Sequence, residues 1–172
     1  MSIGKLTLSY IDDTIKELEQ TGKLSYPEIF QIKEGDLQIS VKAFSVDKIG
    51  LQVDYIHIVK EVMKSRPGVK ELMERQAEYI EKHISYLLEK FKIVELDSLN
   101  QRTQLRSYPP YDTEDGKYFY EILLENGDEI FFQRFNYSYE SKRYEKVISE
   151  FTREMFSRLI NDLVAALNLE KL

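Results

Sequence analysis

The fold follows from one stretch of sequence, Lys117-Tyr-Phe-Tyr-Glu-Ile-Leu-Leu-Glu-Asn-Gly-Asp-Glu-Ile-Phe-Phe-Gln-Arg-Phe-Asn136, which predicts a β-hairpin that is apolar on both faces. Asn126-Gly127 supplies the two positive-φ positions that a type I′ turn requires. A hairpin that lies against water on one side normally alternates apolar and polar residues. We therefore expect both faces of this hairpin to be covered by helices, by a second sheet or by another chain.

A two-residue loop at this turn fixes which residues of the hairpin share a face. One face then carries Leu124 opposite Glu129, Ile122 opposite Phe131, Tyr120 opposite Gln133 and Tyr118 opposite Phe135. The other face carries Phe119, Leu123, Ile130 and Phe132.

Three further strands are indicated outside the hairpin. Residues 36–46 alternate apolar and polar side chains with the period of two that is typical of a half-exposed strand. Residues 51–59 alternate at first and then become apolar on both faces, with His57 between Tyr55 and Val59 on one face. Residues 101–108 lead into the hairpin as a third strand.

Helical spacing of apolar residues predicts a short helix over about 9–20 and two long amphipathic helices over about 68–91 and 140–168. Strands that group with strands, with helices set apart, are typical of the α+β class. We expect one domain, residues 1–172, with a mostly antiparallel sheet of about five strands in two hairpin units, covered by the two long helices.

Composition excludes several classes of protein. The chain has 172 residues, no cysteine and a net charge of −6. Disulfide frameworks and thiol catalysis are therefore excluded, and the acidic charge argues against a general affinity for nucleic acid. No apolar run approaches the ~20 residues that span a bilayer, and the N-terminus does not resemble a signal peptide. We expect a cytoplasmic protein that does not enter a membrane.

Catalytic motifs are scarce in this sequence. The only histidines are His57 and His83, and no His-x-x-x-His or Glu-x-x-His spacing accompanies them. Gly-x-Ser-x-Gly, Gly-x-Gly-x-x-Gly and the phosphate-binding loop are also absent. In the favoured interpretation, the protein therefore holds neither a metal ion nor a cofactor.

The strongest enzymatic alternative is a magnesium-dependent nuclease. Such enzymes place an acid and an Asp/Glu-x-Lys triplet near one another, so that the carboxylates bind the cation and the lysine orients water. Asp115-Gly116-Lys117 has this spacing, with Asp112 nearby, which makes Asp112, Asp115 and Lys117 the candidate catalytic residues. The competing interpretation is an ordinary Asp-Gly turn.

Two arginines on the 101–108 strand are the candidate binding residues. Arg102 and Arg106 share a face with Tyr108, an arrangement that can hold a phosphate chain and stack a base. Alternatively, Arg106 and Arg134 pair with Glu121 or Glu125 across the sheet. A second possibility is a small-ligand pocket lined by Tyr118, Tyr120 and Phe135, with Arg106 anchoring an acidic group.

The sequence favours a non-catalytic binding or regulatory module that forms a homo-oligomer, with a protein partner as a further possibility. The apolar surface of the hairpin and of the last helix exceeds what one layer of helices covers, so we expect self-association through residues 118–135 or 144–167. The nuclease and the small-ligand-binding domain remain as alternatives.

Overall fold

The computed structural model describes residues 1–61, 68–87 and 90–169. In that part of the chain, the elements follow in the order α1 (Ile3–Gln20), β1 (Glu28–Glu34), β2 (Leu37–Val46), β3 (Gly50–Lys60), α2 (Val69–His83), β4 (Lys90–Asp97), β5 (Arg102–Tyr108), β6 (Tyr111–Asp112), β7 (Gly116–Glu125), β8 (Glu129–Ser138), β9 (Tyr144–Val147), β10 (Ser149–Thr152) and α3 (Arg153–Leu167).

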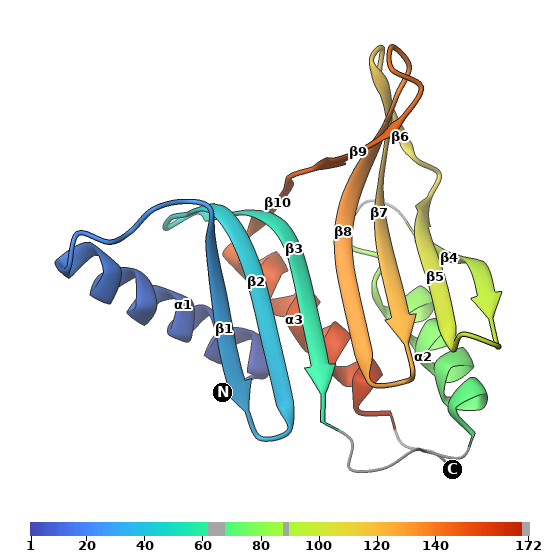
Figure 1. Ribbon diagram of the computed structural model, residues 1–172, viewed down its shortest axis with the longest axis horizontal. Helices are drawn as coiled ribbons and strands as arrows, with labels where there is room; N and C mark the ends of the chain where they lie inside the picture. The colour runs from blue at the N-terminus through green and yellow to red at the C-terminus, as the bar shows by residue number, and fades with distance from the viewer. Residues whose placement is uncertain (62–67, 88–89, 170–172) are drawn as a thin grey trace.

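The ten strands of this part of the chain form one sheet in which every pairing is antiparallel. The main path runs β1-β2-β3-β8-β7-β5-β4, while β10, β6 and β9 pair with β3, β7 and β8. All three helices lie on one face, with α3 between α1 and α2 (Figure 1). The α+β class is confirmed, but the predicted sheet of about five strands under two long helices is wrong.

The first helix begins earlier than predicted. Ser2 is its N-cap, and the Ser2 Oγ accepts a hydrogen bond from the Lys5 N–H at 3.2 Å, which satisfies one of the free donors of the first turn. The helix ends at Gln20, two residues before Gly22, whose φ of +67° is the left-handed conformation that favours glycine. The helix predicted over 9–20 is therefore the C-terminal two thirds of α1.

The helix predicted over 68–91 ends at His83, because Ile84 leaves the helical conformation with φ −95° and ψ +85°. The helical spacing continues through Leu87 and Phe91, and both residues are buried, but Phe91 belongs to β4. Residues 88 and 89 of this prediction lie outside the described residues. The β-branched pair Ile93-Val94 is typical of the strand that follows.

The last helix starts at Arg153 rather than near residue 140. Thr152 is its N-cap, and the Thr152 Oγ1 accepts a hydrogen bond from the Met155 N–H at 3.1 Å. The residues before it form β9 and β10, which pair with β8 and β3. The helical spacing predicts that the apolar stripe of this helix begins with Tyr144, Val147 and Phe151. In the structure, these three residues belong to β9 and β10.

The decisive hairpin turns where predicted, with φ of +55° at Asn126 and +73° at Gly127, but its register is shifted by one residue. Glu125 faces Glu129, so the loop contains three residues and includes Asp128. The Asp128 carbonyl accepts a hydrogen bond from the Lys60 N–H at 2.8 Å, at the end of β3. This contact with a neighbouring strand holds the extra residue in the loop.

The shift decides which hairpin residues enter the core. Ile122, Leu124, Ile130 and Phe132 have no exposed surface, and they face the helices. The apolar stripe of α3 packs against this layer and against α1 and α2 through buried residues that include Phe156, Leu159, Ile160 and Leu163. The apolar surface of α3 is therefore largely used inside the protomer.

The other face of the hairpin is not covered by a helix in the described part of the chain (Figure 1). Leu123 and Phe131 on this face are half-buried. The expectation that both faces of the hairpin are covered is therefore met on one face only. None of the helices among the described residues is both long and apolar enough to cross a bilayer.

Candidate binding surface

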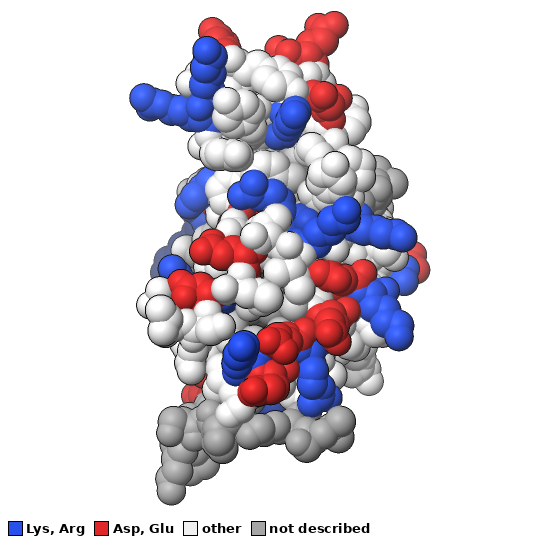
Figure 2. Space-filling model, turned by 90° about the vertical axis from the view of Figure 1, so that its right-hand side faces the viewer, with Lys and Arg blue, Asp and Glu red and all other residues white. Residues whose placement is uncertain are grey.

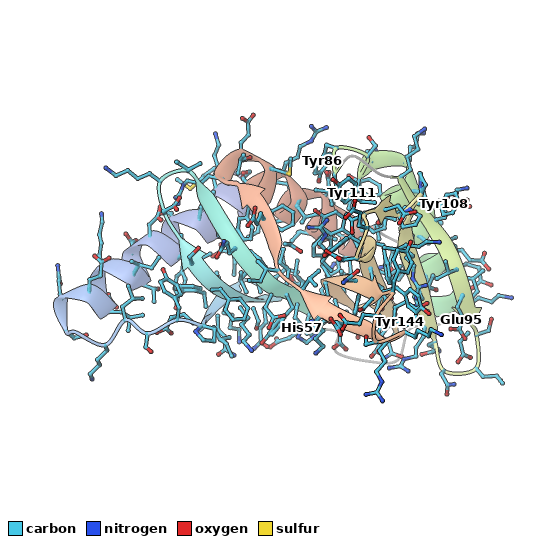
Figure 3. All side chains as sticks on the ribbon, turned by 90° about the horizontal axis from the view of Figure 1, so that it is seen from above. His57, Tyr86, Glu95, Tyr108, Tyr111 and Tyr144 are labelled. Carbon is cyan, nitrogen blue, oxygen red and sulfur yellow. The ribbon has the colours of Figure 1, made fainter. Side chains whose placement is uncertain are left out.

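We define the uncovered face as the side of the sheet opposite the three helices. Its centre is a strip of four half-buried side chains on three adjacent strands, Tyr55 and His57 of β3, Phe131 of β8 and Leu123 of β7. The Phe131 ring lies 5.3 Å from the ring of Tyr55 and 5.5 Å from that of His57. Figure 3 shows His57, Tyr144 and Glu95 on this side and Tyr86 on the helix side.

The charged side chains around this strip are paired across the strands. Lys42 Nζ lies 3.3 Å from Asp54 Oδ2, and His57 Nε2 lies 2.6 Å from Glu129 Oε1. Further along the sheet, the guanidinium groups of β5 pair with carboxylates of β7. The uncovered face is therefore largely neutral over its centre, with its polar side chains held by their neighbours.

The two predicted arginines share this face, as expected, and each has a carboxylate partner. Arg102 donates to Glu125 Oε1 from Nε at 2.9 Å and from Nη2 at 2.7 Å, and this bond raises the pKa of Arg102. Arg106 Nη2 lies 3.4 Å from Glu121 Oε2, and its guanidinium lies 4.4 Å from the centre of the Phe119 ring. Both arginines thus pair across strands instead of standing free.

The predicted aromatic pocket is not assembled. Tyr118 and Tyr120 point to the helix side of the sheet, where the guanidinium of Arg134 lies 5.2 and 5.1 Å from their ring centres. Phe135 faces Phe119 on the uncovered face together with Arg106. The one-residue shift in register separates the pair of tyrosines from Phe135 and Arg106.

The candidate nuclease residues lie at the connection between β6 and β7. Asp112 is opposite Lys117, and its Oδ1 accepts a hydrogen bond from the Tyr139 hydroxyl at 2.5 Å, which raises the pKa of that tyrosine. Asp115 lies in a turn closed by Thr113, whose Oγ1 accepts from the N–H groups of Asp115 and Gly116 at 3.3 and 3.2 Å. Among the described residues, no three His, Cys, Asp or Glu side chains are grouped as metal ligands.

Two small clefts adjoin β4 and β5. One, of about 210 Å³, lies on the helix side between Met73 of α2 and Leu96 of β4. The other, of about 180 Å³, lies on the uncovered face beside Glu95 and Leu123. Both are smaller than the roughly 300–1,000 Å³ that is typical of small-molecule sites.

Sequence reasoning missed the central strip as a site, although its signal was present. The second half of β3 is apolar on both faces, and Tyr55 and His57 alternate with Ile56 and Ile58, which face the core. The pairing of Leu123 with Phe131, which puts both residues on the face of Tyr55 and His57, follows only from the correct hairpin register.

Comparison with known proteins adds no relative, since no protein-family model, no curated protein and no solved structure matches this chain.

Proposed function

We propose that this protein is a non-catalytic binding module that self-associates and holds a partner protein on the uncovered face of its sheet. The observation that carries the proposal is the central strip of Tyr55, His57, Phe131 and Leu123, which is half-buried without a helix across it. Aromatic side chains surrounded by a polar rim are typical of protein interfaces, in which a few apolar anchors supply most of the binding energy.

The charges beside the strip favour a protein partner over a nucleic acid. Asp54, Glu121, Glu125 and Glu129 already have cationic or imidazole partners on adjacent strands. A nucleic acid binds chiefly because lysine and arginine side chains displace the counterions condensed on its phosphates, and a chain of net charge −6 has no general excess of these side chains. The uncovered face, whose charges are paired around a central apolar strip, instead suits a protein partner that matches its shape.

We further propose that residues 1–172 form one domain that works in the cytoplasm. The chain has no cysteine, which fits a reducing compartment, because disulfide-stabilised proteins belong mainly to oxidising ones.

Site-specific photo-crosslinking in cells that make the protein tests the partner-binding face. A benzophenone derivative of phenylalanine replaces Phe131 in one variant and the exposed Glu19 of α1 in a matched control. We expect the probe at position 131 to form an adduct with one protein of defined mass, and the probe at position 19 not to form it. Adding Leu123→Glu to the Phe131 variant should abolish the adduct, because it places a charge in the centre of the strip.

The absence of an adduct at position 131, or the same adduct at position 19, would contradict binding at this face. An adduct of two copies from the purified protein would assign the face to self-association instead of a separate partner. Sedimentation of the purified protein at micromolar concentration tests self-association independently, and a monomer would contradict it.

A further inference from the structure

One edge of the sheet has an open side. In the described part of the chain, β4 pairs only with β5, so the other side of its backbone has N–H and C=O groups available for a further strand. Val94 and Leu96 of this strand are 51% and 53% exposed. Such an edge is the surface on which an additional strand adds to a sheet.

The sequence of β4, Lys90-Phe-Lys-Ile-Val-Glu-Leu-Asp97, is complementary to itself when read in opposite directions. Lys90 then stands opposite Asp97 and Lys92 opposite Glu95, with the apolar residues Phe91 opposite Leu96 and Ile93 opposite Val94 between them. A two-fold axis between Ile93 and Val94 produces this antiparallel alignment of the strand with its own copy.

A bulge in β4 places the complementary charges on one face. In a regular strand, Lys92 and Glu95 would point to opposite faces, because they are three residues apart. The register shift between Ile93 and Glu95 instead aligns Lys92 with Arg106 and Glu95 with Gln104, and these β5 residues share a face. Lys90 and Asp97 follow the same alternation. All four charged side chains of β4 therefore belong to the uncovered face.

The charges are also separated along the strand. The N-terminal half of β4 carries its two lysines and the C-terminal half its two acids. Figure 2 views the molecule from this edge, with a band of Lys and Arg above a region in which Asp and Glu alternate with further Lys and Arg. Turning a second copy by 180° would bring the basic half of one edge against the acidic half of the other.

We infer that β4 is the self-association surface of this protein and that it pairs antiparallel with β4 of a second copy about a two-fold axis between Ile93 and Val94. The inference rests on the self-association in the proposed function and names the surface that carries it. Each ion pair, Lys90 with Asp97 and Lys92 with Glu95, occurs twice across the axis. Two protomers then share one continuous sheet, and their uncovered faces lie side by side.

The opposite edge of the sheet lacks this complementarity. A two-fold axis at Gln31 would set Glu28 against Glu34 across a pair of β1 strands. Lys33 points to the face opposite from both glutamates, so no two-fold register of β1 pairs opposite charges. The hairpin β7–β8 has a neighbour on both sides, since it lies between β3 and β5. Strand addition by a second copy is thus favoured at β4.

The local contacts of β4 are compatible with this pairing. Glu81 Oε1 accepts the Ile93 N–H at 3.1 Å, so we expect main-chain pairing on either side of the bulge instead of at Ile93 itself. The Asn100 side-chain and backbone N–H groups lower the pKa of Asp97, which keeps its carboxylate charged. Within the described residues, neither Lys90 nor Glu95 forms an ion pair.

Charge exchange at Lys92 and Glu95 tests the proposed pairing by sedimentation equilibrium of the full chain. Lys92→Glu alone and Glu95→Lys alone each set like charges opposite one another at two places, so each should raise the dimer dissociation constant about tenfold or more. The double variant Lys92→Glu/Glu95→Lys should return it to within about threefold of the wild-type value, since opposite charges face each other again. An equimolar mixture of the two single variants should form a heterodimer, because every charge pair is then complementary.

Lys33→Glu on β1 is the matched control and should leave the dissociation constant unchanged. Circular dichroism establishes that each variant is folded. A wild-type monomer at micromolar concentration would overturn both the edge pairing and the self-association of the proposed function. A wild-type dimer that the single variants leave intact, or that the double variant and the mixture fail to restore, would overturn the edge pairing alone.

Discussion

The carbonyl oxygen of Gly127 accepts a hydrogen bond from the Gln76 Nε2 at 2.8 Å, which joins the turn of the β7–β8 hairpin to the middle of α2. Both residues are buried, and the Leu72 side chain lies beside the same turn. Gly127 is therefore part of the packed core, whereas Asn126 of the same turn is exposed.

Gly127→Ala should destabilise the protein by more than the cost of its backbone conformation. A left-handed residue other than glycine costs about 1–2 kcal/mol, and Gly127 has φ +73°. A Cβ at this position would also lie 3.0 Å from Leu72 Cδ2. Chemical denaturation should show a loss of about 2 kcal/mol or more in the free energy of unfolding.

Gly22→Ala is the control for Gly127→Ala. Gly22 has φ +67°, but a Cβ there would meet no atom within 4 Å, so only the conformational cost applies. Equal losses in the two variants would contradict the packing of the turn against α2.

Leu123→Ala and Leu124→Ala should differ sharply, although the two residues are adjacent in β7. Leu124 is fully buried against the helices, and truncation of such a leucine costs about 2–5 kcal/mol. Leu123 is half-buried on the uncovered face, so its truncation should cost about 1 kcal/mol or less in the isolated protomer. Thermal or chemical denaturation of both variants measures the difference, and similar losses would contradict the assignment of the two faces.

The sequence was sufficient to place the hairpin turn, because Asn126-Gly127 is a local signal. It was not sufficient for the register, since Asp128 is held in the loop by the Lys60 N–H, a partner that is distant in sequence. The extra loop residue also prevents the predicted aromatic pocket from forming, because it places Phe135 on the face opposite from Tyr118 and Tyr120. The pairing of Arg106 with Glu121 was foreseen because it depends on strand order and charge.

The edge strand shows a second limit of sequence reasoning. Phe91 continues the helical spacing of α2, so the pattern predicts a helix at the start of β4 and hides the self-complementary charges of that strand. Only the sheet order makes β4 an edge, and only the bulge brings Lys92 and Glu95 to the same face. Both properties depend on pairing with β5.

Gly4→Ala should separate the first and last helices. A Cβ on Gly4 of α1 would lie 2.1 Å from the backbone oxygen of Ser157 in α3, and the Gly4 N–H donates to Asn161 Oδ1 at 2.7 Å. Backbone atoms cannot move aside as a side chain can, so we expect a loss of roughly 2–3 kcal/mol in the free energy of unfolding. Lys16→Ala, at an exposed position of the same helix, is the control. A loss in Gly4→Ala no larger than that in this control would contradict the close approach of the two helices.

Tyr86→Phe should lower stability at neutral pH and make it less sensitive to alkali. The Tyr86 hydroxyl donates to Asp162 Oδ2 at 2.7 Å, and the Arg158 guanidinium lies 4.1 Å from the centre of its ring. Loss of a hydrogen bond to a charged acceptor costs about 1.5–3 kcal/mol, which urea denaturation at pH 7 should detect. Tyr10→Phe, at an exposed position of α1, is the matched control and should change little.

The alkaline behaviour follows from the pKa of Tyr86. Burial, followed by the hydrogen bond to Asp162, raises the pKa of Tyr86 in the folded protein above its ordinary value of about 10. Above about pH 10, the unfolded chain therefore loses this proton while the folded protein keeps it, so the free energy of unfolding falls as the pH rises. The Tyr86→Phe variant lacks this contribution, and its stability should fall less steeply than that of the wild type between about pH 10 and 12. Parallel curves for the two proteins would show that the Tyr86 hydroxyl is not held in its protonated form by the fold.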